Sequence, residues 1–228
     1  MQLYIGNKNY SSWSMRPWVL MRQTGIAFDE VLVRFDAFTA DSRFKREMQR
    51  VTPAGRVPVL VDDDGFAVWE TLAIAEYLAE KFPSLTLWPA GPQARARARC
   101  LCAEMHAGFG ALRSHCPMNI EASLPDVGRR VIAEQRAVRD DLARVVQMWS
   151  EQLETSGGPM LFGEFCVADA YYAPVASRIR TYELPVPAEV AAYVDRLLAL
   201  PGVEAWVQDA LEEREFLDFE EPHRKSRG

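Results

Sequence analysis

The sequence predicts a small α/β domain followed by an all-helical domain. Two observations predict this fold class. In the first third of the chain, short apolar runs alternate with segments of helical periodicity, whereas only helical patterns remain after a proline- and glycine-rich stretch. We therefore expect an α/β domain over residues 1–82, a linker over residues 83–92 and a helical domain over residues 93–228.

The first domain follows the order β-α-β, then an irregular segment, then β-β-α. Gly25 is typical of a helix C-terminus, and the run from Asp62 to Gly65 between two apolar segments indicates a hairpin. The expected elements are, in order, a strand at 2–6, a helix at 14–25, a strand at 28–35, a charged helix or loop at 42–51, a hairpin at 56–70 and a helix at 71–82.

The second domain is read as helices because prolines and glycines separate segments of helical periodicity. These helices are expected at 93–115, 126–156, 167–181, 187–200 and 202–214. The highly charged tail at 212–228 is expected to fray at its end.

Composition limits the classes of function. The 228 residues are 49% hydrophobic and 25% charged, with a net charge of -6, which argues against a nucleic-acid partner because such proteins normally carry a basic face. The sequence shows neither a secretory signal nor an apolar run of membrane-spanning length. Cys100, Cys102, Cys116 and Cys166 fit neither a disulfide framework nor a zinc pattern. We expect a cytoplasmic protein with reduced thiols, no bound metal and no membrane contact.

Three serines precede the first helix in "NYSSWSMRPW", residues 9–18. Serine before a helix usually acts as a cap, and proline fits a helix only in its first turn. Taking Ser14 as the N-cap puts Pro17 at the third helical position, so Ser11 and Ser12 are expected in the preceding loop. Trp13 lies beside the serines and is expected to line a site, whereas Trp18 is expected in the core.

The stretch "TPAGRVPVL", residues 52–60, places Pro58 at the start of a strand. A cis Val57–Pro58 bond would turn the Val57 backbone toward solvent, where its N–H and C=O could pair with an extended, peptide-like ligand. The alternative is an ordinary edge-strand proline.

In "WETLAIAEYL", Glu70 and Thr71 stand where a strand is followed by a helix. The free N–H groups and positive dipole of the helix N-terminus suit a carboxylate, and Glu70 could hold an ammonium group. Together they match the head group of an α-amino acid. The alternative is an acidic residue placed favourably in the first helical turn.

These three stretches, in this order, resemble the glutathione transferase superfamily over essentially the whole chain. "LFGEFCVADAYYAPV" is similar to the buried capping-box motif of that family, and "YSSWSMRPW" most resembles the zeta class, the maleylacetoacetate isomerases. The resemblance implies a thioredoxin-like first domain. Two positions depart from the pattern: Trp13 replaces the zeta cysteine, and Cys166 replaces the usual Ser or Thr cap, so we expect a weaker helix start there.

The resemblance implies the roles of the first-domain residues. Ser11, or else Ser12, would donate a hydrogen bond to the glutathione thiolate, with no base needed beside it. Lys45 and Arg56 are both candidates for the glycyl carboxylate. The tripeptide would otherwise contact Trp13, Val57, Pro58, Glu70 and Thr71.

An electrophile pocket would lie between the domains, beside the first helix of the second domain. The candidates there are Met105, His106, Phe109 and Arg113, which are spaced about one helical turn apart. For His106 the alternative to acid–base chemistry is simple packing, and for Arg113 the alternative to binding an anionic substrate is an ion pair within the protein.

The resemblance therefore implies a homodimeric glutathione transferase, with glutathione as co-substrate, that adds the thiol to a small hydrophobic electrophile in detoxification. Two alternatives stay open: a glutathione-dependent cis–trans isomerase of the maleylacetoacetate type, and a non-catalytic binding module of the same fold.

Overall fold

The first domain is built on a four-stranded sheet with the strand order β2-β1-β3-β4. Its computed structural model, like that of the rest of the chain, describes residues 1–227. The parallel pair β1–β2 is extended by β3, which runs antiparallel to β1, and β4 closes the expected hairpin with β3. The strands are β1 Gln2–Ile5, β2 Asp29–Leu32, β3 Val59–Val61 and β4 Ala67–Trp69.

Alternation along the strands buries both faces of this sheet. Leu3, Ile5 and Leu60 face the main core, which they share with helices α1 and α3. The opposite face packs against α2 in a smaller cluster that includes Val59 and Phe44. The helices of this domain are α1 Ser12–Gln23, α2 Arg43–Met48 and α3 Thr71–Lys81.

The second domain is all-helical, as predicted, but two of the expected helices are each divided in two. Gly108 ends α4 by donating its N–H to Glu104 O (2.8 Å), and Phe109 then adopts a left-handed backbone with φ 55°. The Arg139 guanidinium caps the end of α6 through the carbonyls of Ile132 (2.6 Å) and Ala133 (3.0 Å). The helices are α4 Pro92–Ala107, α5 Gly110–His115, α6 Pro125–Glu134, α7 Arg136–Ser156, α8 Val167–Tyr182, α9 Ala188–Leu198 and α10 Pro201–Glu213, with a short 3-10 turn at Asp218–Glu220.

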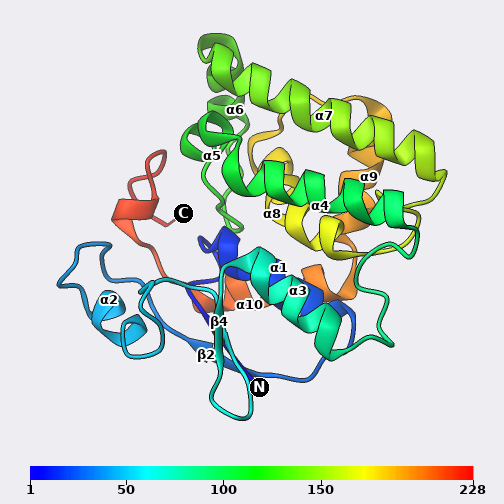
Figure 1. The fold of residues 1–228 in the computed structure, drawn as a ribbon. Coiled ribbons are helices and arrows are strands. Elements are labelled where there is room, and N and C mark those ends of the chain that lie inside the picture. Colours follow the sequence, from blue (N-terminus) through cyan, green and yellow to red (C-terminus); the bar gives the residue numbers. More distant parts are fainter. Residues whose placement is uncertain (228) are drawn as a thin grey trace.

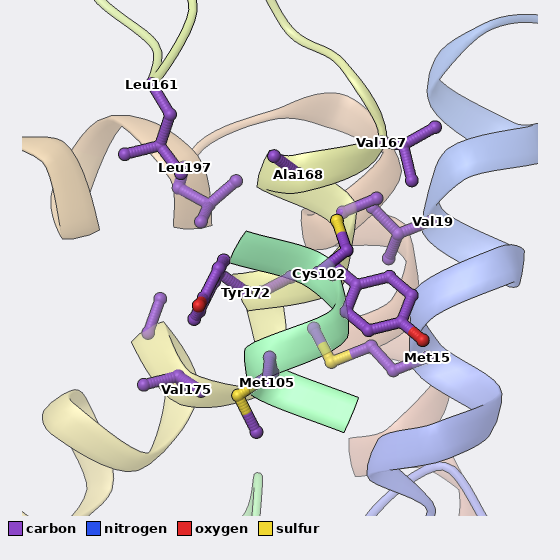
Figure 2. Close-up of a cluster of buried hydrophobic side chains, with 14 of the residues drawn as sticks. Met15, Val19, Cys102, Met105, Leu161, Val167, Ala168, Tyr172, Val175 and Leu197 are labelled. Atoms are coloured by element: carbon purple, nitrogen blue, oxygen red, sulfur yellow. The ribbon is translucent and has the colours of Figure 1, made fainter. Parts of the chain in front are cut away.

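Helix α8 runs through the middle of the second domain and also contacts the first (Figure 1). It packs against α1, α4, α6 and α9 and is buried along almost its whole length. Figure 2 shows the shared core, to which α1 contributes Met15, α4 contributes Met105 and α8 contributes Tyr172. Trp18 is 3% exposed and packs edge-on against Trp206 of α10, so its predicted place in the core is confirmed.

Asp169 secures the start of α8. Its carboxylate accepts the N–H of Cys166 (2.9 Å), the N–H of Leu161 (3.2 Å) and the hydroxyl of Tyr193 (2.9 Å). The capping box therefore forms even though cysteine replaces the usual hydroxyl residue at position 166.

The charged tail does not fray over most of its length. Glu221 is 5% exposed and accepts hydrogen bonds from Tyr10 Oη (2.8 Å) and Asn119 Nδ2 (2.9 Å), and His223 bonds His115 O (2.9 Å). The tail therefore links the first domain to the second, and Figure 1 shows it between α5 and the loop that carries α2. The expectation that the tail frays at its end is wrong as far as Arg227, because charged groups up to that residue have partners; Gly228 lies outside the described residues.

None of the helices over residues 1–227 is both long enough and apolar enough to cross a bilayer.

Replacing Asp169 with alanine is expected to lower the free energy of unfolding by about 3–5 kcal/mol, because three buried donors lose their only carboxylate acceptor. Urea unfolding followed by circular dichroism measures the loss. Asp126→Ala serves as the control, since the Asp126 side chain is 90% exposed. A loss below about 1 kcal/mol for Asp169→Ala would contradict this role.

Candidate functional site

Two adjoining cavities lie where the serine loop meets the second domain. The large cavity has a volume of about 570 Å³ and the small cavity about 280 Å³. Trp13, Arg56 and Val57 border both. The large cavity is also lined by Ser11, Ser12, Lys45, Arg113 and Arg178, and the small one by Pro58, Trp69, Glu70, Thr71 and His106.

Helix α1 begins earlier than the serine pattern predicts. Its first residue is Ser12 and its N-cap is Ser11, so the assignment of Ser14 as the cap is wrong. Ser14 has another function, because its hydroxyl accepts the N–H of Gly6 at the end of β1 (3.1 Å). Pro17 consequently lies inside the helix, where it supplies no N–H to the preceding turn.

The Ser11 hydroxyl is part of a short chain of hydrogen bonds. It donates to Ser14 Oγ (2.7 Å), which also receives the Gly6 N–H. Ser11 and Ser12 are 6% and 8% exposed, yet both border the large cavity. The start of α1 thus places two serine side chains at the edge of the large cavity.

The Val57–Pro58 peptide bond is cis, as the sequence motif suggested. Strand pairing of β3 begins only at Val59, opposite Trp69, so the Val57 backbone lies outside the ladder. Lys45 on α2 donates to Gly55 O (2.9 Å) in the loop that precedes this bond.

In the small cavity, Glu70 and Thr71 meet two residues of the second domain. Glu70 is the N-cap of α3 and holds a left-handed backbone with φ 70°, an uncommon conformation for a residue other than glycine. Its Oε2 lies 3.5 Å from His106 Nε2. Tyr171 Oη lies between His106 and Thr71, 3.1 Å from His106 Nδ1 and 2.5 Å from Thr71 Oγ1.

The four candidates for the electrophile pocket separate in the structure. Arg113 borders the large cavity, and His106 lies in the small cavity beside Glu70 instead. Met105 and Phe109 are 0% and 5% exposed and belong to the core, so their placement in a pocket is wrong. The buried face of α4 points toward α8 (Figure 2), and the helix break at Gly108 ends the regular spacing on which the prediction for Phe109 relied.

Several residues around the cavities carry no obvious signal in the sequence. Tyr171 and Arg178 stand seven residues apart on α8, two turns along one face of a mostly apolar helix. Arg16 of α1 is 1% exposed and lies over the rings of Trp13 (3.9 Å) and Tyr171 (4.6 Å). A charged residue inside an apolar helical pattern was the one signal that could have indicated Arg16 and Arg178.

Tyr10 also borders the large cavity, but its hydroxyl is engaged. It donates to Glu221 Oε1 (2.8 Å) and accepts the N–H of Leu217 (3.3 Å). Burial and the hydrogen bond to Glu221 raise the pKa of Tyr10 to about 12. The single phenol proton is therefore held by the tail, so Tyr10 is not available as a hydroxyl donor to this cavity.

The tail adds Glu220 to the rim of the large cavity. Burial and the neighbouring charge of Glu221 raise the pKa of Glu220 to about 7, compared with 4.5 in an unfolded chain. Between these two values the folded state binds one more proton than the unfolded state, so this group makes folding less favourable as the pH rises from 4.5 to 7.

The free energy of unfolding of Glu220→Gln, relative to that of the wild type, is therefore expected to rise by about 2 kcal/mol from pH 4.5 to pH 8. Chemical denaturation of both proteins at the two pH values measures this change. Glu212→Gln, at an exposed position on α10, is the matched control. An equal difference between Glu220→Gln and wild type at both pH values would show that the Glu220 carboxyl titrates normally.

Comparison with known proteins agrees with this arrangement. Residues 10–81 match the profile of the glutathione S-transferase N-terminal domain. A glutathione transferase homolog from Burkholderia, solved with bound glutathione, has 26% sequence identity and a TM-score of 0.69, with 94% of this chain and 98% of that chain covered. Over residues 10–81 the chain belongs to the glutathione S-transferase N-terminal domain family. Its thioredoxin-like domain followed by an all-helical domain is the glutathione transferase fold, as predicted.

The curated relatives of the chain carry more than one kind of name. A stringent starvation protein A homolog from Histophilus somni is 24% identical over 162 residues, which are 71% of this chain and 68% of the homolog. A probable maleylacetoacetate isomerase from Caenorhabditis elegans is 30% identical over 112 residues, 49% of each chain. The similarity to the zeta class thus extends over half of the protein.

Proposed function

We propose that this protein is a glutathione transferase that activates the glutathione thiol at the serine loop and adds it to a small electrophile in the large cavity. One observation carries the proposal. Four segments that are far apart in the sequence, which contain Ser11, Lys45, Val57 and Glu70, surround two joined cavities. Each supplies the kind of group that one part of the tripeptide requires.

The γ-glutamyl end suits the small cavity. The N-terminus of α3 offers free N–H groups to a carboxylate, and Glu70 offers a carboxylate to the ammonium group. Thr71 is held by Tyr171, which orients its hydroxyl at the start of the helix. His106 contacts both Glu70 and Tyr171, so it is a positioning residue in this proposal.

The middle and the glycyl end of the tripeptide suit the junction of the two cavities. The free backbone edge of Val57 can pair with the cysteinyl peptide unit as an added strand would. Lys45 and Arg56 border the large cavity and supply positive charge for the glycyl carboxylate.

Thiolate formation depends on the serines. A free thiol has a pKa near 8.5, so a hydrogen bond donated to the sulfur and the dipole of α1 both favour the anion at neutral pH. Hydroxyl protons rotate, so the Ser11–Ser14 bond can reverse: Ser14 then donates to Ser11, and Ser11 donates to the sulfur. The Gly6 N–H holds Ser14 in place throughout.

The isomerase alternative uses the same activated thiol. The relative from Caenorhabditis elegans carries that name and is similar to this chain over about half of its length. Trp13 stands where that class has a cysteine, and it fills the junction of the cavities. We therefore place addition to an electrophile first. The proposal includes a homodimer.

Ser11→Ala is expected to bind glutathione with nearly wild-type affinity but without releasing a proton near neutral pH, because the sulfur loses its hydroxyl donor. The rate of conjugation to a broad aryl halide should fall about 10- to 100-fold. Calorimetric titration in buffers of different ionisation enthalpy measures the proton release. Ser12→Ala is the matched control, and the same loss in Ser12→Ala with no loss in Ser11→Ala would reassign the role.

Glu70→Gln is expected to weaken glutathione binding about 10- to 100-fold, because the ligand ammonium loses its charged partner. The same calorimetric titration gives the dissociation constant. Glu80→Gln, on the exposed side of α3, should leave the affinity unchanged. An unchanged affinity in Glu70→Gln would show that the γ-glutamyl group binds elsewhere.

A further inference from the structure

Three arginines from three different helices gather around Trp13 and the large cavity. Arg16 of α1 and Arg113 of α5 lie over the same indole ring, 3.9 Å and 5.5 Å from its centroid. Arg178 of α8 is 3% exposed and borders the large cavity together with Arg113. The three groups are close enough for their charges to repel one another.

No carboxylate pairs with these guanidinium groups in the part of the chain that the structure describes. The arginines that form ion pairs there are others, at positions 34, 43, 99, 129, 136, 144, 180, 224 and 227. Among residues 1–227, Arg178 donates only to the carbonyls of Cys116 (2.8 Å) and Pro174 (3.1 Å). The Nε of Arg113 and both Nη atoms of Arg16 are buried without an acceptor among residues 1–227.

An arrangement of this kind opposes folding unless something compensates it. Buried polar groups normally have partners, and buried cations without a counter-ion are costly. Burial lowers the pKa of Arg178 to about 9 and that of Arg16 to about 10, and the neighbouring arginines act in the same direction. An anion in the large cavity would supply a counter-charge to Arg113 and Arg178, which border it.

The position of these arginines relative to the serines indicates the chemical class of the anion. Ser11 and Ser12, where the thiol is proposed to lie, border the same cavity as Arg113 and Arg178. The same cavity is also lined by apolar side chains, among them Phe35, Phe44 and Met118, and by Glu220. A molecule that spans this space needs an apolar body, with a carbon the sulfur can reach at one side and a negative charge at the other.

We propose that the electrophile is an organic acid whose carboxylate binds Arg113 and Arg178. This inference rests on the proposed function and names its substrate class. A planar carboxylate matches the guanidinium fork, which can donate two parallel hydrogen bonds. Glutathione does not need Arg113 or Arg178 in this proposal. Its two carboxylates bind Lys45 or Arg56 and the N-terminus of α3, and its ammonium group binds Glu70.

With a halogenated acid the reaction balances simply. The thiolate sulfur forms a bond to the carbon that carries the halogen, the carbon–halogen bond breaks, and the halide leaves with the electron pair. The carboxylate of the acid is unchanged and only holds the substrate. No oxidant, reductant or metal takes part.

The first test is a binding measurement with a matched pair of probes, 4-methylbenzoate and its neutral analogue 4-methylbenzamide. Each is titrated calorimetrically into the wild type, with and without saturating glutathione. We expect the benzoate to bind at least about tenfold more tightly than the amide in both cases, the usual value of one charge-assisted hydrogen bond. Arg113→Gln should remove this preference, and Arg130→Gln, at an exposed position on α6, should keep it.

Arg178→Gln is a second variant, to be used only where circular dichroism shows a wild-type fold, because Arg178 is deeply buried. Equal affinity for the two probes, or a preference for the amide, would overturn the inference. Competition between the benzoate and glutathione would overturn it as well, since the arginines would then hold the tripeptide. If glutathione fails to bind, the proposed function fails, yet the benzoate titration without glutathione still decides whether the anion site exists.

Turnover gives an independent readout. The rates with 4-(chloromethyl)benzoate and 4-(chloromethyl)benzamide, each corrected for the uncatalysed reaction with glutathione, are expected to differ at least about tenfold in kcat/KM in favour of the acid. In Arg113→Gln this ratio should fall toward one, mainly through KM. A ratio near one in the wild type would contradict the assignment of the substrate class.

Discussion

The packing of α1 against α8 is the interaction on which the rest of the structure depends. Arg16 shows how close it is, because its guanidinium is enclosed between Trp13 and Tyr171 and its Nε donates to Tyr171 O (3.2 Å). Helix α1 belongs to the first domain by its position beside β1, yet its buried face is completed by the second. The start of α1 carries the serine loop, so the same packing sets the distance from Ser11 to every residue of the helical domain.

The functional surface follows from that contact. The first domain supplies hydroxyls, a free peptide edge and a carboxylate, whereas the second supplies Arg113, Arg178 and the His106–Tyr171 pair. The tail then closes one side, where Phe219 packs edge-on against Phe38 (5.4 Å) and Glu221 occupies the hydroxyl of Tyr10. Each domain alone would present half of a site. The buried arginines, each unfavourable within its own helix, are therefore grouped where the two domains meet.

Turn chemistry and periodicity act over short distances, so the sequence predicted the order of elements and the hairpin. It left the cis bond at Pro58 as one of two alternatives, and the grouping of Val57, Glu70 and Thr71 was implied by the resemblance to a family. The sequence-based predictions failed where the role of a residue depends on a partner that is distant in the sequence. Ser14 looked like a cap because nothing in the local pattern reveals that Gly6 uses its hydroxyl. Met105 has the spacing of a pocket residue, but only its contact with α8 shows that it is core. The tail seemed free because Tyr10 and Asn119, its partners, lie more than one hundred positions away.

A crystal structure of the protein grown with reduced glutathione tests the central claim most directly. The account predicts the cysteinyl sulfur within hydrogen-bonding distance of Ser11 Oγ, the γ-glutamyl group between Glu70 and the start of α3, and Arg113 and Arg178 free of the tripeptide. Glutathione bound with its sulfur away from both Ser11 and Ser12, or with a carboxylate on Arg178, would contradict the account.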